Sequence, residues 1–448
     1  MDFKKLALEY KEDALKTLTD LVAFKSVLDE FKEDSDAPFG IENKRALEYM
    51  LNLGKNDGFI AYNDQNYAGH LECGKGKDLI GVLAHLDVVP VKDQVWASDP
   101  FTARISDNKF YARGALDDKG PLVAAYYALK LLKDQNIKLN KRVRLIMGCD
   151  EETGSRCLTH YFKTAEMPTL GFSPDAEFPV IYGEKAMASM DLYLKETDNV
   201  ILDFICGTRY NIVPAVAKMK LSINLEKEYL EYLKENNYEG SIEDGYLVAK
   251  GLSAHAMCPQ NGVNAAFILM KFLNKHHKTN VSEYFVKYLT NDPFAKKLGI
   301  DLYDEDMKHL TENVGLVNYV DGFIKVGLNY RIPRDNYHNE IINKFSETIS
   351  ENDKVVLLSS STMHYVSKDS FLVKTLMESY RLITNDYENE PFTIGGGTYA
   401  KFIDNCVAFG PQMPGMPDVC HIADEYIDID NFVNSIAVYA KAIYDLGK

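Results

Sequence analysis

The sequence lacks the features that bring a protein to a membrane or to nucleic acid. No run of about 18 apolar residues, the length that a helix needs to span a bilayer, occurs anywhere. The first residues have no apolar signal core, and residues 2–25 instead show the spacing of an amphipathic helix. Basic residues are outnumbered, with 50 Lys and Arg against 66 Asp and Glu. This acidity argues against nucleic acid or anionic membrane as a partner, because both attract basic patches.

Cysteine is scarce and has no pairing pattern. The seven cysteines are scattered, their number is odd and no two form a CxxC pair. This usage is typical of free thiols in a reducing compartment. We therefore expect a soluble protein of the cytoplasm.

The length predicts more than one domain, since 448 residues exceed what one hydrophobic core usually serves. Residues 1–183 and 366–448 have an α/β pattern, which favours a mostly parallel sheet with flanking helices. Residues 184–365 alternate short strands with two helices, predicted at 261–277 and 338–350. They indicate an inserted α+β domain, in which residues 279–312 are expected to be helical.

A buried strand carries the first candidate site residues. Residues 79–83 form a short apolar run, which favours a strand covered on both faces. His85 and Asp87 follow it, and in extended chain both point to the same side. Taken alone, they fit a buried histidine hydrogen-bonded to an aspartate. At the carboxyl end of a strand in an α/β sheet, they also fit a functional site.

Acidic residues occur at three further places where the predicted sheet meets its loops. Asp117 and Asp118 precede a helix predicted at 122–133, with Pro121 as its first residue. Glu151 and Glu152 follow the strand predicted at 143–148, and Asp175 follows residues 170–172. Each alone is explained by a helix cap or a solvated loop. Together the four places present His85 with Asp87, Asp117 with Asp118, Glu151 with Glu152, and Asp175.

Metal chemistry gives these residues a common purpose. Two divalent cations need a bridging carboxylate, further carboxylates and imidazoles, and a bridging water. Zinc accepts both nitrogen and carboxylate oxygen. Glu151 is left over as a general base beside such a water, and Asp87 is left to orient His85. The candidate ligands are His85, Asp117, Glu152, Asp175 and His421.

The motifs at these positions resemble a known family. They are His85-x-Asp87, residues 115–120 (ALDDKG), residues 150–154 (DEETG), residues 173–175 (SPD) and Cys420-His421. In this order they resemble the co-catalytic di-metal superfamily of aminoacylases, carboxypeptidases and dipeptidases. Residues 37–40 (APFG), the large insert and the run DAEFP most resemble bacterial PepV-type (Xaa-His-like) dipeptidases.

The resemblance implies a role for each residue. Asp117 would bridge two metal ions, and the Asp117–Asp118 peptide would be cis. One ion would be completed by His85 and Asp175, the other by Glu152 and His421. Glu151 would take a proton from the bridging water, and only the resemblance sets the order of Glu151 and Glu152. Two divalent cations are implied; the ligands favour zinc, and manganese or cobalt would also fit.

The insert carries further motifs of the family, so it would be a lid. His255, in the run GLSAHA, would stabilise the oxyanion of the tetrahedral intermediate. Asn211 would contact the substrate, and the planar fork of Arg331 would bind the terminal carboxylate. Gly396 and Thr398 would add donors nearby. The family often has a small residue where this chain has Tyr399, a departure that affects this loop.

The sequence thus predicts a cytoplasmic metallopeptidase that hydrolyses dipeptides with a free amino terminus. An N-acyl-amino-acid deacylase or desuccinylase with the same metal site is the alternative. A peptide-binding protein that has lost catalysis is disfavoured, because Glu151 and every ligand are present. The large insert favours a monomer over a dimer.

Overall fold

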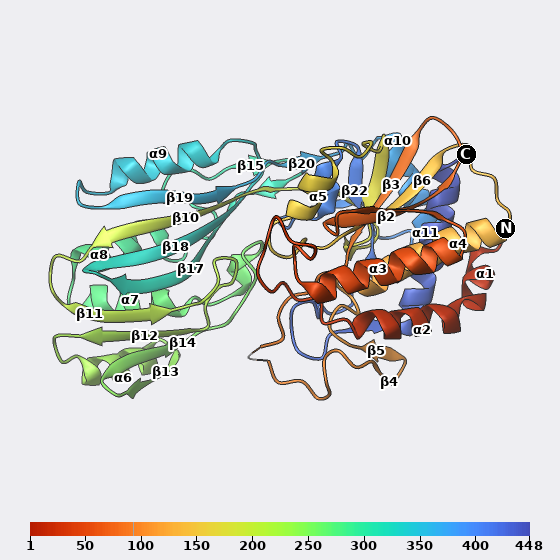
Figure 1. Cartoon of the computed structure of the whole chain (residues 1–448). Coiled ribbons are helices and arrows are strands. Elements are labelled where there is room, and N and C mark those ends of the chain that lie inside the picture. Colours follow the sequence, from red (N-terminus) through yellow and green to blue (C-terminus); the bar gives the residue numbers. More distant parts are fainter. Residues whose placement is uncertain (93) are drawn as a thin grey trace. The chain divides into compact units, whose positions relative to one another are not determined.

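The computed structural model describes residues 1–92 and 94–448. These residues form two compact units, traced in Figure 1. No helix in the described ranges is long and apolar enough to cross a membrane. The first unit comprises Met1–Tyr182, Tyr365–Phe392 and Gly397–Lys448, and the second comprises Gly183–His364 and Thr393–Gly396.

A mixed sheet forms the centre of the first unit, with the strand order β1-β2-β6-β3-β7-β22. Strand β3 pairs parallel with β6 and β7, and β22 pairs parallel with β7. Strand β2 pairs antiparallel with β1 and β6. Every residue of β3 is buried, as its apolar sequence predicts. The carboxyl ends of β3, β6 and β7 therefore lie at one edge, where α/β folds build their sites.

The strands outside the second unit's sheet are short. They are β1 (Ile60–Asp64), β2 (Ala68–Gly74), β3 (Leu79–His85), β4 (Arg104–Ser106), β5 (Lys109–Tyr111), β6 (Arg142–Gly148), β7 (Leu170–Ser173), β8 (Ala176–Glu177), β9 (Ile181–Glu184), β20 (His364–Tyr365), β21 (Phe392–Ile394), β22 (Cys406–Ala408), β23 (Pro411–Gln412) and β24 (Tyr426–Asp428).

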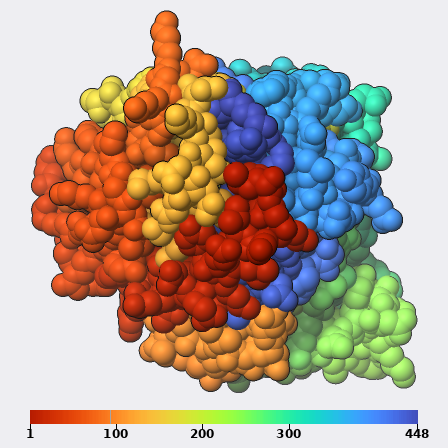
Figure 2. All heavy atoms as spheres, turned by 90° about the vertical axis from the view of Figure 1, so that its right-hand side faces the viewer, coloured from red at the N-terminus to blue at the C-terminus, as the bar shows by residue number. Residues whose placement is uncertain are grey.

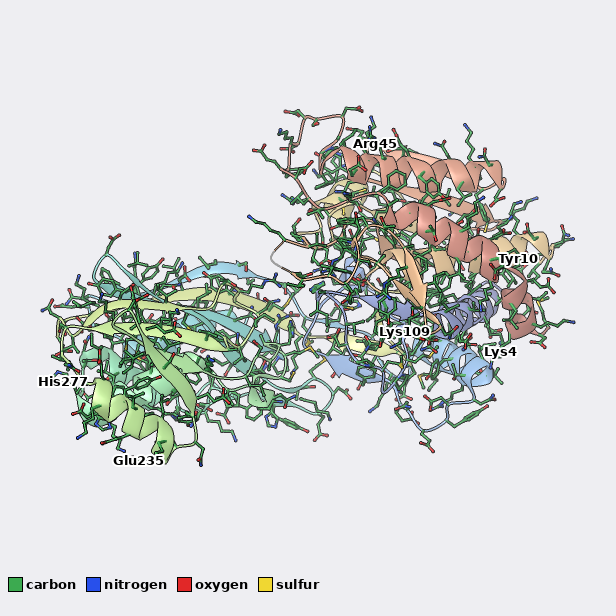
Figure 3. All side chains as sticks on the ribbon, turned by 90° about the horizontal axis from the view of Figure 1, so that it is seen from below. Lys4, Tyr10, Arg45, Lys109, Glu235 and His277 are labelled. Carbon is green, nitrogen blue, oxygen red and sulfur yellow. The ribbon has the colours of Figure 1, made fainter. Side chains whose placement is uncertain are left out.

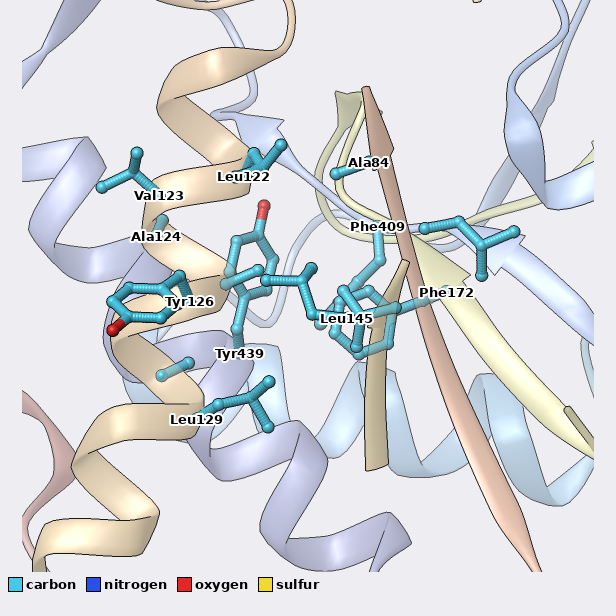
Figure 4. Packing of buried hydrophobic residues seen from close by; sticks show 14 of the residues in the cluster. Ala84, Leu122, Val123, Ala124, Tyr126, Leu129, Leu145, Phe172, Phe409 and Tyr439 are labelled. Carbon is cyan, nitrogen blue, oxygen red and sulfur yellow. The ribbon is translucent and has the colours of Figure 1, made fainter. Parts of the chain in front are cut away.

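Helices pack against this sheet through apolar faces. Figure 4 shows Leu122 and Leu129 of α4 and Tyr439 of α11 beside Leu145 and Phe172 of the strands. Helix α4 begins at Lys119, so Pro121 is its third residue rather than its first. The helices are α1 (Phe3–Glu9), α2 (Lys11–Val22), α3 (Ile41–Asn56), α4 (Lys119–Asp134), α5 (Arg156–Tyr161), α10 (Phe371–Thr384) and α11 (Ile429–Leu446).

The two ends of the chain lie together in the first unit. Helix α1 packs on α11, and the rings of Phe3 and Tyr444 are 5.7 Å apart. Figure 2 shows the red amino-terminal residues directly beside the blue carboxyl-terminal ones. The carboxyl-terminal segment, which contains His421, is therefore packed into the same core as the first residues.

An eight-stranded antiparallel sheet forms the second unit, in the order β13-β14-β12-β11-β17-β18-β10-β19. Alternate residues of β10, such as Ala188, Met190 and Leu192, enter the core beneath the helices. The strands are β10 (Ala186–Lys195), β11 (Ile201–Cys206), β12 (Val216–Leu221), β13 (Glu239–Glu243), β14 (Tyr246–Lys250), β17 (Thr311–Val320), β18 (Phe323–Ile332) and β19 (Lys354–Ser360), with a separate hairpin of β15 (Tyr303–Asp304) and β16 (Lys308–His309).

The helices of the second unit differ from the prediction in two places. Helix α6 (Glu226–Glu235) was not predicted. Within residues 279–312 only α8 (Asn280–Tyr284) and the π-helical turn that follows it (Phe285–Leu289) are helical. The helical expectation was wrong for the rest of this range, which contains β15, β16 and the start of β17. Pro293 and Gly299, at φ +70°, follow the turn and disfavour a continued helix.

The remaining helices, α7 (Ala265–His276) and α9 (His338–Thr348), fall within the predicted ranges. His277, just beyond α7, lies exposed at the surface (Figure 3).

Candidate metal centre

His85 is the last residue of β3 and is fully buried. Its Nδ1 lies 2.9 Å from the carbonyl oxygen of Asp87, which orients the ring so that Nε2 faces the carboxylates. The Asp87 carboxylate is farther away, at 3.5 Å. The residue that was expected to orient His85 therefore does so through its backbone rather than its side chain.

The Asp87 carboxylate has another partner, the turn after β6. Its two oxygens accept hydrogen bonds from the backbone amides of Glu151 and Glu152, both at 3.0 Å. Asp87 is buried, so these charge-assisted bonds are shielded from water. Asp87 thus fixes the backbone that presents both glutamates.

Asp117 lies between the two imidazoles. Its Oδ1 is 3.0 Å from Nε2 of His85, and its Oδ2 is 2.8 Å from Nε2 of His421. Asp175 lies 3.5 Å from His85, and Glu152 lies 3.3 Å from His421. The structure therefore brings all five predicted ligands together. The Asp117–Asp118 peptide bond is cis, which confirms what the resemblance implied.

The charged groups of this cluster shift one another's pKa values. Burial lowers the pKa of His421, but hydrogen bonds to Asp117 and Glu152 outweigh it and raise that pKa to about 11. Burial alone would raise the pKa of Asp117, yet the hydrogen bonds from His421 and His85 bring it below its usual range. The carboxylates thus hold positive charge at this place.

Two buried carboxylate oxygens of the cluster lack hydrogen-bond partners among the described residues. They are Oε1 of Glu152 and Oδ1 of Asp118. An unsatisfied buried polar atom costs about 1–3 kcal/mol, so a ligand for these atoms is expected. Imidazole nitrogen with carboxylate oxygen is a zinc-type donor set.

Two groups have ligand atoms within 4.8 Å of one another, His85–Asp117–Glu152 and His85–Asp118–Asp175. The residues present fit two divalent cations. The second group includes Asp118, which was not among the predicted ligands. Oδ2 of Asp118 accepts a hydrogen bond of 2.9 Å from the His85 amide, so Asp118 also supports the strand end.

Glu425 is a supporting residue that sequence reasoning missed. Its Oε1 accepts hydrogen bonds from the amides of Leu116 at 2.8 Å and Asp117 at 3.1 Å. Its Oε2 lies 2.6 Å from Arg113 in a fully buried ion pair. Glu425 thus holds the loop that presents Asp117. In the sequence, only the place of Glu425 four residues after His421 pointed to this role. No local pattern reveals its pairing with Arg113, which lies about 310 positions earlier in the chain.

The same ion pair continues to the loop that holds His421. Arg113 donates to Oε1 of Gln94 at 2.8 Å, and Nε2 of Gln94 donates to the His421 carbonyl at 2.7 Å. The Arg113 guanidinium lies over the Trp96 ring, 5.1 Å from the centre of that ring. One network therefore fixes the loops of both Asp117 and His421.

Tyr399, the departure from the family pattern, is fully buried behind the cluster. Its ring meets the His85 ring edge to face at 6.1 Å, and its hydroxyl lies 2.9 Å from Sγ of Cys157. A Cβ at Gly148 would come within 2.2 Å of this hydroxyl, so Gly148 makes room for it. Thr398 caps the following turn by accepting a hydrogen bond from the Ala400 amide at 3.1 Å.

The predicted residues of the insert also gather within the second unit. The Ala256 amide, next to His255, donates to the Asn211 carbonyl at 2.9 Å. The Thr311 hydroxyl donates to the Ala256 carbonyl at 2.8 Å, and Thr311 is the cross-strand partner of Arg331. Asn211, His255 and Arg331 therefore come from adjoining segments.

Gly395 and Gly396 belong to the second unit as well. The Gly395 carbonyl accepts a hydrogen bond from Arg331 at 2.7 Å. A Cβ at Gly395 would lie 2.7 Å from Cβ of Met257, so this close approach requires glycine. The glycine run thus lies directly on Arg331.

Comparisons with known proteins agree with this geometry. The family model "Peptidase family M20/M25/M40" matches residues 81–445. The chain is 41% identical over 467 residues to "Putative dipeptidase YtjP" of Bacillus subtilis, with 100% of each chain covered.

Solved structures share the fold. Human carnosine dipeptidase 1 is 15% identical with a TM-score of 0.59, covering 99% of this chain and 98% of that one. The M20 metallo-carboxypeptidase Sso-CP2 of Sulfolobus solfataricus is 19% identical with a TM-score of 0.58, covering 97% and 99%. At these identities the likeness concerns the α/β fold with its mixed sheet.

Proposed function

The chain belongs to peptidase family M20/M25/M40, and from this premise we propose that it hydrolyses dipeptides with a free amino terminus. It is a hydrolytic metallopeptidase, and relatives that cover its whole length are named dipeptidases. The observation that carries the proposal is the Asp117 carboxylate, which has one imidazole at each oxygen. This is the arrangement that a carboxylate shared by two cations requires.

The ligands divide into two sets around Asp117. His85 and Asp175 would hold one divalent cation and Glu152 and His421 the other, with Asp117 common to both. Bound cations would lower the pKa of a shared water and polarise the scissile carbonyl. Zinc is our first choice because of the donor set, with manganese or cobalt as alternatives.

Glu151 is the general base of this proposal. No hydrogen bond or ion pair engages its carboxylate within residues 1–92 and 94–448, although its amide is fixed by Asp87. Burial and then the charge of Asp175 raise the pKa of Glu151 well above its usual value. A raised pKa suits a group that accepts a proton from the attacking water and then gives it to the leaving amine.

The second unit would bind the substrate. Arg331 would bind the terminal carboxylate, His255 would stabilise the developing oxyanion, and Asn211 would contact the peptide. Gly396 and Thr398 would add donors. The adjoining positions of Asn211, His255 and Arg331 within the unit support this assignment. The cytoplasmic location and the monomeric state stay predictions.

The proposal is tested by hydrolysis of three matched substrates by the protein reconstituted with zinc or manganese. They are a free dipeptide, its N-acetylated form and the corresponding tripeptide. Cleavage of the free dipeptide alone is expected. Preference for the acetylated compound would make the protein a deacylase with the same ligands. No turnover with two cations bound would contradict the proposal.

A further inference from the structure

Two buried cations of the second unit have no counter-charge among the described residues. Lys185 is 9% exposed and Arg331 is 5% exposed. The Lys185 ammonium donates to the His309 carbonyl at 2.5 Å. Arg331 donates through Nε to Oδ1 of Asn329 at 2.9 Å and through Nη1 to the Gly395 carbonyl. Among the described residues, no carboxylate pairs with either cation, although a buried charge normally requires one.

The two cations lie close to each other in the second unit. Met187 of β10 is the cross-strand partner of Arg331, and Lys185 lies just before β10, two residues ahead of Met187. The Lys185 amide and the Arg331 guanidinium donate to the carbonyls of consecutive residues, Ile394 and Gly395, so the two residues meet the same short segment.

The electrostatics agree with this placement. Burial, and then the charge of Arg331, lower the pKa of Lys185 to about 8. Burial also lowers the pKa of Arg331 to about 10. Both groups stay largely protonated at neutral pH, so the face holds two unbalanced positive charges.

Both residues also flank the glycine run. The Lys185 amide donates to the Ile394 carbonyl at 3.1 Å, next to the Gly395 carbonyl that accepts from Arg331. The Nη2 group of Arg331 has no partner in the described chain. It is therefore available to an acceptor that comes from outside the protein.

We propose that Lys185 joins Arg331 in a two-cation site that binds the terminal carboxylate of the substrate. This inference rests on the proposed dipeptidase function and adds Lys185 as a second residue that reads the carboxylate. A charge-assisted hydrogen bond to a carboxylate contributes enough to change affinity about 10- to 100-fold. Recognition would therefore depend on the substrate's negative charge, and a carboxamide in its place would bind weakly.

The test compares a dipeptide with its carboxyl-terminal amide in Lys185→Met, Lys185→Arg and the exposed control Lys234→Met. Lys185→Met should raise KM for the dipeptide about 10- to 100-fold, leave kcat nearly unchanged and remove the preference over the amide. Lys185→Arg should keep part of that preference, and Lys234→Met should match the native protein. An unchanged preference in Lys185→Met would overturn the proposal.

A binding measurement separates this proposal from the proposed function. Calorimetric titration of the same two ligands into Glu151→Gln and Glu151→Gln/Lys185→Met needs no turnover. Weaker dipeptide binding in the double variant supports the site even if no dipeptide is hydrolysed. Equal binding by both variants overturns the two-cation site even if the native protein proves to be a dipeptidase.

Discussion

The two units bury charge of opposite sign without full compensation. In the first unit, Asp117, Asp118, Glu151, Glu152 and Asp175 surround two imidazoles. In the second, Lys185 and Arg331 have no carboxylate partner among the described residues. Buried charge is unfavourable unless it is paired. The charges of the first unit therefore favour bound cations, and those of the second unit favour a bound anion.

The largest effect is expected from Glu151→Gln, which removes the base and leaves the cation ligands in place. We expect kcat to fall about 100- to 10,000-fold, while two metal ions per chain remain bound. Activity assays and metal analysis check this, with the exposed Glu9→Gln as control. A variant that retains native activity would show that the acidic cluster acts without Glu151.

Asp117→Asn tests cation binding by the acidic cluster of the first unit. The amide keeps the shape of the side chain but removes the charge shared between His85 and His421. Metal affinity should fall by more than about 100-fold, beyond the loss typical of outer-shell partners. Titration with zinc against Asp107→Asn, an exposed control, measures it, and two tightly bound ions in Asp117→Asn would contradict a shared carboxylate.

Arg331→Met tests anion binding by the two cations of the second unit. It removes one of the two cations while a chain of similar length stays against Met187 and Gly395. KM for the dipeptide should rise about 100-fold, since a bond to a charged group is lost, and metal binding should not change. Arg334→Met, at an exposed position, provides the control. Loss of metal from Arg331→Met would argue against separate roles for the two units.

Glu425→Gln should give the smallest effect and tests how strongly metal binding depends on the residue that holds the loop of Asp117. The variant keeps an acceptor for the Asp117 amide but leaves Arg113 without its buried partner. Metal affinity should fall about 10-fold, as for other residues that hold a ligand in place, and Tm should decrease. The neighbouring Asp424→Asn is the control, and native affinity in Glu425→Gln would assign Glu425 to stability alone.

Sequence patterns predicted which side chains gather in the cluster better than they predicted the contacts that support it. Short motifs around His85, Asp117 and His421 have fixed spacing, so each can be read locally. The network of Arg113, Glu425 and Gln94 joins distant segments and has no local pattern. For the same reason the contact between the Asp87 carboxylate and the amides of residues 151 and 152 could not be predicted.

The secondary structure was likewise predicted only in part. The buried strand at β3 and helices α7 and α9 follow from clear apolar patterns, and their observed bounds lie at or near the predicted residues. Residues 279–312 have apolar spacing that resembles a helix, but Pro293 and the turn at Gly299 prevail. The short helix α6 was missed because charged residues outnumber its apolar ones, although Tyr229, Tyr232 and Leu233 have the spacing of a buried helical face.

Anomalous diffraction from crystals grown with zinc would show directly whether two cations share Asp117. We expect two peaks about 3.5–4 Å apart, one on each side of the Asp117 carboxylate. One peak should lie beside His85 and Asp175 and the other beside Glu152 and His421. A single peak, or two peaks that do not share Asp117, would contradict a carboxylate shared by two cations.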